Sequence, residues 1–184
     1  MRAVTDDYEV VATDDASRDR SLEMLLEIAK HDSHWRVQRF AENCGESAAS
    51  AAGMKAATGK IIVTLDADLQ NDPKDIPKFL EAIKTADCVC GSRVHERADN
   101  WLRRVSSSIA NGVRNKLSDE NISDAGCTYR AFKRECLAEV KFFRGAHRFL
   151  PTLFRMDGWK VVEIPITPRE RFAGESKYGV WNRL

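Results

Sequence analysis

The sequence lacks a continuous run of 18 apolar residues, an internal repeat and a low-complexity segment. A helix that spans a membrane needs about 20 consecutive apolar residues, so we expect this chain not to cross a bilayer by itself. No signal peptide is recognisable at its start. The five cysteines are odd in number and include no C-x-x-C pair, and Cys88 and Cys90 alternate within an apolar stretch, as residues of a buried strand do. This pattern argues against a disulfide framework and favours a reducing compartment.

What the chain does contain is enough apolar material for a core. Its 184 residues are 43% hydrophobic and 31% charged, which is ordinary for a globular protein and predicts one folded domain over residues 1–184. Residues 1–92 carry 11 basic and 17 acidic side chains, a net of −6, whereas residues 93–184 carry 18 and 11, a net of +7. An acidic half can hold a divalent cation and a basic half can receive anions, although chance distribution over solvated faces is the alternative.

Apolar runs that suit strands alternate with helical patterns in the first half of the chain. The run at 61–65 (IIVTL) is continuously apolar, as expected of a parallel strand covered on both faces. This alternation predicts an α/β fold with a Rossmann-like, mostly parallel sheet and helices on both faces. The apolar content before Tyr8 is too low for a further strand, so we expect the first strand of such a sheet to be missing. The predicted strands lie at residues 8–13, 36–40, 61–65, 87–91, 127–132 and 160–164.

The most hydrophobic of these runs is followed by the segment DADLQ. In an extended chain, residues i, i+2 and i+4 point to the same side, so Asp66, Asp68 and Gln70 would direct three oxygen ligands at one point. Hard cations such as Mg²⁺ and Mn²⁺ prefer oxygen ligands, and ligands of open α/β sheets bind beyond the carboxyl ends of strands. The segment therefore predicts a metal site. A solvated acidic turn is the alternative, because D-x-D triplets are common by chance.

Asp14 and Asp15 follow the first predicted strand and would line the same crevice. A carboxylate there could accept hydrogen bonds from a nucleobase or a ribose, and the alternative is a helix-entry turn. Basic residues could bind phosphates, because Arg supplies paired donors and Lys a point charge. Each basic group alone could equally be a solvated face. The groups are Arg93; Arg103 and Arg104 with Ser107; and Arg171 with Ser176 and Lys177.

Several of these segments occur together in the order of a known family. They are DDAS (14–17), Asn43 with Gly45, DADLQ (66–70), Asp72-Pro73, GSR (91–93), SDAGC (123–127), YRAF (129–132) and R-x-x-G-x-SKYG (171–179). In this order they resemble family 2 glycosyltransferases of the polyprenyl-phosphate type, such as dolichyl-phosphate mannose synthases and undecaprenyl-phosphate glucosyl- or aminoarabinosyl-transferases. The resemblance covers nearly the whole chain, and the ordered set is far more specific than any one segment.

The resemblance implies a GT-A fold and an inverting, metal-dependent transfer. The implied donor is a nucleotide-diphosphate hexose of the UDP-glucose or GDP-mannose type, and the implied acceptor is undecaprenyl or dolichyl phosphate. Mg²⁺ or Mn²⁺ is the implied cofactor. Residues 1–92 would bind the nucleotide sugar and metal, and residues 93–184 the acceptor phosphate. By position, the implied metal ligands are Asp68, Gln70 and Asp66; the nucleotide-sugar contacts are Asp14, Asp15, Asn43 and Asp66; the phosphate contacts are Arg93, Arg103, Ser107, Arg171, Ser176 and Lys177; and the catalytic residues are Asp66, Asp68, Asp124 and Arg93.

The chain departs from the family at two places. The family's first strand, with its Pro-x-Tyr-Asn-Glu type motif, is absent, and this strand helps to hold the nucleotide. Members often carry a His shortly before the basic loop, where this chain has Pro168. The alternatives are a soluble family 2 enzyme acting on a glycan, which needs no R-x-x-G-x-SKYG loop, and an inactive nucleotide-binding fragment, which the absent strand favours.

A lipid acceptor implies contact with a membrane surface. We expect a peripheral protein at the cytoplasmic face, with no nucleic-acid partner, and the sequence does not indicate its oligomeric state. Residues 137–154 mix aromatic with basic side chains, which suits an interfacial helix. Core packing under the sheet is the alternative.

Overall fold

Strands and helices alternate along most of the chain. A computed structural model of the protein describes residue 5, residues 7–93, residues 127–167 and residue 169. The elements, including the one-turn 3-10 helices η1 and η3, are β1 (Val10–Asp14), α1 (Ser21–His31), β2 (Trp35–Arg39), α2 (Glu46–Ala56), β3 (Ile61–Thr64), η1 (Pro73–Asp75), α3 (Ile76–Ala82), β4 (Cys88–Ser92), β5 (Arg130–Lys133), η3 (Arg134–Leu137), α5 (Ala146–Met156) and β6 (Val161–Pro165). The predicted alternation through β4 is confirmed.

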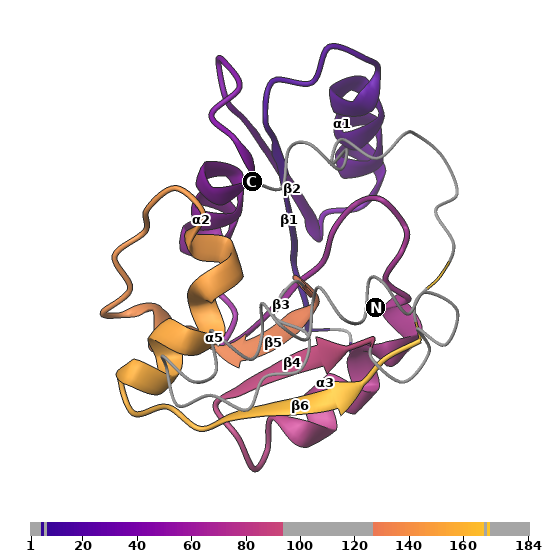
Figure 1. Ribbon diagram of the computed structural model, residues 1–184. Coiled ribbons are helices and arrows are strands. Elements are labelled where there is room, and N and C mark those ends of the chain that lie inside the picture. Colours follow the sequence, from indigo (N-terminus) through magenta and orange to yellow (C-terminus); the bar gives the residue numbers. More distant parts are fainter. Residues whose placement is uncertain (1–4, 6, 94–126, 168, 170–184) are drawn as a thin grey trace, which may run out of the picture.

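The strands of the described residues form two sheets. β1 and β2 pair in parallel, with Asp14 opposite Arg39 at their carboxyl ends. The other four strands lie in the order β3-β5-β4-β6, with β4 and β6 parallel and β5 antiparallel to both of its neighbours. Figure 1 shows the pair β1 and β2 above the four-stranded sheet. The predicted α/β class is confirmed, and β3, β4 and β6 run in the same direction. The antiparallel β5 between β3 and β4 and the division of the described strands into two sheets were not predicted.

The four-stranded sheet buries a different core on each face. Cys88 and Cys90 pack on one face with Phe132 and with Leu150 and Phe154 of α5. The alternate residues Val89 and Ala131 face the other way, against Ile76, Phe79 and Ile83 of α3. Both cysteines are at most 1% exposed, which confirms their assignment to a buried strand. Because successive side chains of a strand point to opposite faces, helices cover the sheet on both sides.

Helix α2 joins the two sheets. Met54 belongs to the core that includes Cys88 and Phe132, while Gly53 lies against β1. A Cβ added at Gly53 would lie 3.1 Å from Oγ1 of Thr13, so the close approach of α2 to β1 depends on the missing side chain. The same helix therefore fixes both halves of the site described below.

Candidate functional site

The two acidic segments predicted from the sequence lie at the carboxyl ends of two strands: Asp14 is the last residue of β1, and Asp66 lies two residues beyond the end of β3. In each segment one residue other than glycine has a positive φ: 56° at Ala16 and 61° at Leu69. These are the two such residues in the described part of the chain. A left-handed conformation costs an L-residue roughly 1–2 kcal/mol, and such residues cluster at functional sites. The conformations of both loops are therefore imposed by their surroundings.

Asp15 organises the loop that follows β2. Its carboxylate accepts hydrogen bonds from Nδ2 of Asn43 (2.8 Å) and from the backbone N–H groups of Cys44 (2.7 Å) and Gly45 (2.9 Å). The structure thus brings together Asp15 and Asn43, both predicted to contact a nucleoside. In this arrangement the carboxylate holds the loop 43–45, which leads into α2.

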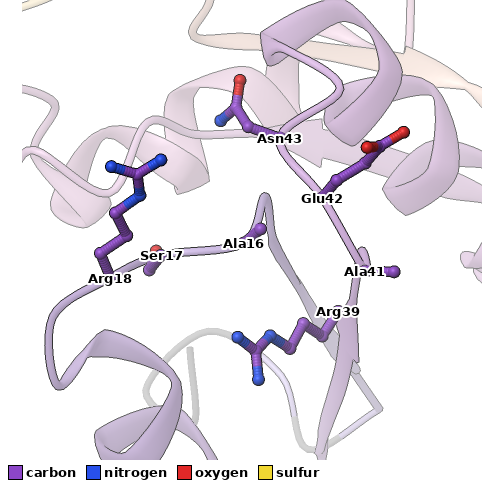
Figure 2. Close-up of a pocket in the computed structure, with 7 residues that line it drawn as sticks. All are labelled: Ala16, Ser17, Arg18, Arg39, Ala41, Glu42 and Asn43. Carbon is purple, nitrogen blue, oxygen red and sulfur yellow. The ribbon is translucent and has the colours of Figure 1, made fainter.

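Asp14 lies beneath this loop, with 4% of its surface exposed. Its carboxylate accepts from the backbone N–H of Ser17 at 3.3 Å and pairs with Nε of Arg39 at 3.5 Å. Both of these partners line a pocket of about 610 Å³. In Figure 2 the side chains of Arg18, Arg39 and Asn43 stand around its opening. The lining residues are Ala16, Ser17, Arg18, Arg39, Ala41, Glu42 and Asn43.

The sequence analysis missed Arg18, Arg39 and Glu42. The signal for Arg39 was available, because it ends β2 opposite Asp14 and the carboxyl ends of neighbouring parallel strands lie at one edge of a sheet. No sequence pattern distinguishes Arg18 or Glu42 from ordinary surface residues. Together they give the pocket two guanidinium groups and one carboxylate.

The segment after β3 is a turn, so the predicted extended geometry of residues 66–70 is wrong. β3 ends at Thr64, and Leu69 has the positive φ described above. The Asp68 carboxylate accepts a hydrogen bond from the backbone N–H of Gln70 at 3.1 Å. Asp side chains commonly bond the backbone two residues on and so stabilise turns. This local bond competes with the extended chain that the spacing suggested.

Asp66 lies in a mixed electrostatic environment. The hydroxyl of Thr128 donates to its Oδ2 at 2.5 Å. Desolvation by the surrounding protein raises the pKa of Asp66, and the negative charges of Glu46 and Asp68 raise it further. The Thr128 hydrogen bond and the positive charge of Arg93 lower the same pKa. Asp66 therefore lies within electrostatic reach of both Asp68 and Arg93.

The end of the acidic turn, at Gln70 and Asp72, is held by residues from distant parts of the chain. The Tyr129 hydroxyl donates to the backbone carbonyl of Asp72 at 3.0 Å. The backbone N–H of Arg169 donates to the carbonyl of Gln70 at 2.9 Å, and its guanidinium pairs with the Asp72 carboxylate. Tyr129, just before β5, and Arg169, after β6, thus hold the turn in place.

These side chains could hold a divalent cation. Within the described residues, no group of three His, Cys, Asp or Glu side chains has metal-binding geometry. Asp66, Asp68 and Gln70 nevertheless supply two carboxylates and an amide oxygen, and Mg²⁺ is usually held by one or two carboxylates with the remaining positions filled by phosphates and water. The oxygen donors therefore fit Mg²⁺ or Mn²⁺.

Buried His147 forms a polar cluster with the start of α2 that was not predicted. Nδ1 of His147 lies 2.7 Å from the Ser47 hydroxyl, and Nε2 lies 3.2 Å from the Glu46 carboxylate. Burial lowers the pKa of His147, while Glu46 opposes the shift and Asp66 does so more weakly. Because Ser47 and His147 are 100 residues apart in the chain, no local spacing could have revealed the contact.

The remaining predicted site residues lie outside the described residues: Arg103, Ser107, Asp124, Arg171, Ser176 and Lys177. Pro168, where the family often has His, also lies outside them.

Comparisons with known proteins agree with this architecture. Two solved structures share the fold: the mannosyltransferase PcManGT of Pyrobaculum calidifontis in complex with GDP-Man and Mn²⁺ (TM-score 0.63, 20% identity, 90% of this chain and 48% of that chain), and glucosyl-3-phosphoglycerate synthase of Mycobacterium tuberculosis in complex with Mn²⁺, UDP-glucose and phosphoglyceric acid (TM-score 0.64, 20% identity, 93% and 65%). The predicted GT-A fold is confirmed.

Curated relatives are more similar in sequence. The undecaprenyl-phosphate 4-deoxy-4-formamido-L-arabinose transferases of Edwardsiella ictaluri and Aeromonas hydrophila are 36% and 34% identical to this chain, over 94% and 98% of its length. The chain spans about half the length of these relatives, 54% and 56%. The model of the protein family described as "Glycosyl transferase family 2" matches residues 2–141. The resemblance inferred from the ordered motifs is confirmed, and the chain belongs to glycosyl transferase family 2.

Proposed function

We propose that this chain is the catalytic part of an inverting glycosyltransferase that moves a sugar from a nucleotide diphosphate to a polyprenyl phosphate. The observation that carries the proposal is the position of Asp66 and Asp68 in the turn after β3, with Arg93 within electrostatic reach of Asp66. The curated relatives are named for transfer to undecaprenyl phosphate, which supports this class of acceptor.

The leaving group of such a reaction is a nucleoside diphosphate, on which negative charge builds as the bond to the sugar breaks. A divalent cation at the turn would neutralise this charge as a Lewis acid. Asp66, Asp68 and Gln70 would hold it, and Arg93 would add a positive charge on the same side. Asp124 would orient the reacting groups.

The acceptor phosphate needs little help from a base. Its second pKa is roughly 6, so its oxygen is already anionic near neutral pH. Cations that position it matter more, and residues 93–184 carry the chain's net positive charge. This is the role we propose for Arg103, Ser107, Arg171, Ser176 and Lys177.

The nucleoside would enter the pocket at the ends of β1 and β2. Arg18, Arg39 and Asn43 line it and can donate hydrogen bonds to a base or a ribose, whereas Glu42 can accept them. Asp14 and Asp15 would support these groups from below, because both carboxylates already accept backbone N–H bonds. This assigns them a supporting role in nucleotide-sugar binding.

The start of α5 offers a surface for the membrane that carries the acceptor. Phe143 and Phe149 are 50% and 41% exposed, with ring centroids 6.3 Å apart. Lys141, Arg144 and Arg148 are exposed and lie within three residues of these rings in the sequence. Exposed aromatic rings with basic neighbours suit an anionic bilayer surface. Leu150 and Phe154 are buried, so core packing accounts for these two residues, and the interfacial role is proposed for Phe143 and Phe149.

This surface is proposed as a peripheral contact. None of the helices in the part of the chain that the structure describes is long and apolar enough to span a membrane. The free cysteines favour the cytoplasmic, reducing side. Flotation with vesicles that contain anionic lipid tests the contact: the double variant Phe143→Ser with Phe149→Ser should release the protein, whereas Met24→Ser, on exposed α1, should not. Retention of the double variant would contradict it.

A donor screen tests the reaction. Undecaprenyl phosphate, dolichyl phosphate and a glycan acceptor should each be offered with UDP-glucose, GDP-mannose and a nucleotide-linked 4-deoxy-4-formamido-L-arabinose, in the presence of Mn²⁺ or Mg²⁺. Transfer to a lipid phosphate supports the proposal, and transfer to a glycan alone supports a glycan-extending enzyme instead. Calorimetry with UDP or GDP and Mn²⁺ distinguishes the third alternative, since absence of heat would indicate an inactive fragment.

A further inference from the structure

The Asp66 carboxylate is held by a residue that no sequence motif singled out. Thr128 donates its hydroxyl to Oδ2 of Asp66 at 2.5 Å. A carboxylate has about four lone-pair positions, so this bond fixes the orientation of the group and leaves positions for a further ligand. Hydrogen bonds to ligating carboxylates orient them for the metal.

Thr128 can do this because its own backbone is fixed. Its carbonyl accepts a 2.6 Å hydrogen bond from Oγ1 of Thr64, the last residue of β3. Its neighbours Cys127 and Tyr129 are 1% and 0% exposed. The segment before β5 is therefore anchored to the strand from which the acidic turn begins.

The antiparallel course of β5 creates this arrangement. β3 pairs with β5 so that Thr64 lies opposite Arg130, which brings the residues before β5 alongside the residues after β3. Thr128 then reaches Asp66, and Tyr129 reaches Asp72. The two consecutive side chains fasten the beginning and the end of the acidic turn.

We propose that Thr128 is a positioning residue that holds Asp66 in the orientation needed to bind the metal and nucleotide diphosphate. The inference rests on the proposed function and adds to it a residue outside the acidic turn. It predicts that the hydroxyl matters, and not the shape of the side chain. It also predicts that the effect appears in metal binding itself, before any sugar is transferred.

Thr128→Val removes the hydroxyl and keeps the shape, and Thr128→Ser keeps the hydroxyl. Binding of Mn²⁺ with UDP and with GDP should be measured by calorimetry on the full chain, with the melting temperature of each variant. We expect Thr128→Val to weaken Mn²⁺ binding at least about tenfold, as is typical for groups that orient metal ligands. We expect Thr128→Ser to bind nearly as the original protein does. Thr85→Val, whose hydroxyl bonds the Ala82 carbonyl on the surface, should leave binding unchanged.

The outcomes separate the inference from the function. If the original protein binds Mn²⁺ and Thr128→Val binds it equally well, the role of Thr128 is refuted and the proposed function stands. If the original protein binds no Mn²⁺ with either nucleotide, both are refuted. Should Thr128→Val fold poorly, Thr128→Ala against Thr128→Ser makes the same comparison, and equal affinities would refute the role.

Discussion

The hydroxyl of Ser47 lies 2.7 Å from Nδ1 of His147 and accepts a 2.7 Å hydrogen bond from the backbone N–H of Gly145. This contact joins the start of α2, which packs on β1, to the start of α5, which packs on the four-stranded sheet. Helix α2 therefore contacts the region of α5 in two ways: through this polar contact of Ser47, and through Met54, which belongs to the same apolar core as Leu150 and Phe154. The contact therefore links the part of the chain that carries β1 to the four-stranded sheet.

Ser47→Ala should destabilise the protein by about 1–2 kcal/mol, because it leaves the Gly145 N–H and the His147 ring nitrogen without this partner. Urea unfolding measures the change. Ser50→Ala makes the same substitution on the same helix and should change the free energy of unfolding by less than about 0.5 kcal/mol. Equal effects of the two substitutions would show that the junction is not stabilising.

The elements were predictable where the signal is local. The continuous apolar run at 61–65 and the alternation of Cys88 and Cys90 identified β3 and β4, because a strand that is buried on both faces has a nearly continuous apolar sequence. The direction of β5 was not predictable, because the residues of a short strand indicate that it is a strand but not which strands it pairs with or in which direction. The site divides in the same way: Asp66 and Asp68 were found from their place after a strand, whereas Thr128 and His147 come from distant segments.

Gly91→Ala should destabilise the protein by about 1–3 kcal/mol, the usual cost of overpacking a core. A Cβ at this position would lie 2.9 Å from Cδ1 of Ile166 and 3.2 Å from Cζ of Phe79. Gly59→Ala is the matched control, since its Cβ would meet only the Ile61 carbonyl, at 3.4 Å. Thermal or urea unfolding checks both. A similar loss in the two variants would mean that the packing around Gly91 can relax.

Glu9 should make the stability of the β1–β2 unit depend on pH. Hydrogen bonds from the Thr58 hydroxyl and N–H, with weaker help from Arg36 and Gly59, lower the pKa of Glu9 from 4.5 to about 2. A lowered carboxyl pKa stabilises the folded state above the unfolded pKa, and this contribution disappears as the pH falls through the folded pKa. The destabilisation caused by Glu9→Gln should therefore be full at pH 7, shrink between pH 4.5 and pH 2, and vanish below. Urea unfolding of both proteins at pH 7 and pH 3 measures it, and a pH-independent difference would contradict the assignment.

Asp68→Ala should reduce metal-dependent turnover by at least about 100-fold. A catalytic metal contributes several kcal/mol to the transition state, and each 1.4 kcal/mol changes the rate tenfold. Turnover should be followed as Mn²⁺ is titrated into chelator-washed protein. Asp157→Ala, which changes an exposed carboxylate after α5, should keep full activity. Full turnover by the chelator-washed Asp68→Ala protein would exclude a metal role for this residue.

Ala16→Gly should stabilise the protein by up to about 1 kcal/mol, although glycine usually destabilises. Ala16 has φ 56°, a conformation that costs an L-residue roughly 1–2 kcal/mol. Glycine removes this cost but loses about 0.5–1 kcal/mol through the greater freedom of the unfolded chain. At exposed Ala138, where φ is −56° and ψ is −43°, only the second effect operates, so Ala138→Gly should destabilise. Urea unfolding of the two variants should therefore give changes of opposite sign, and destabilisation by both would show that the loop at Ala16 relaxes without strain.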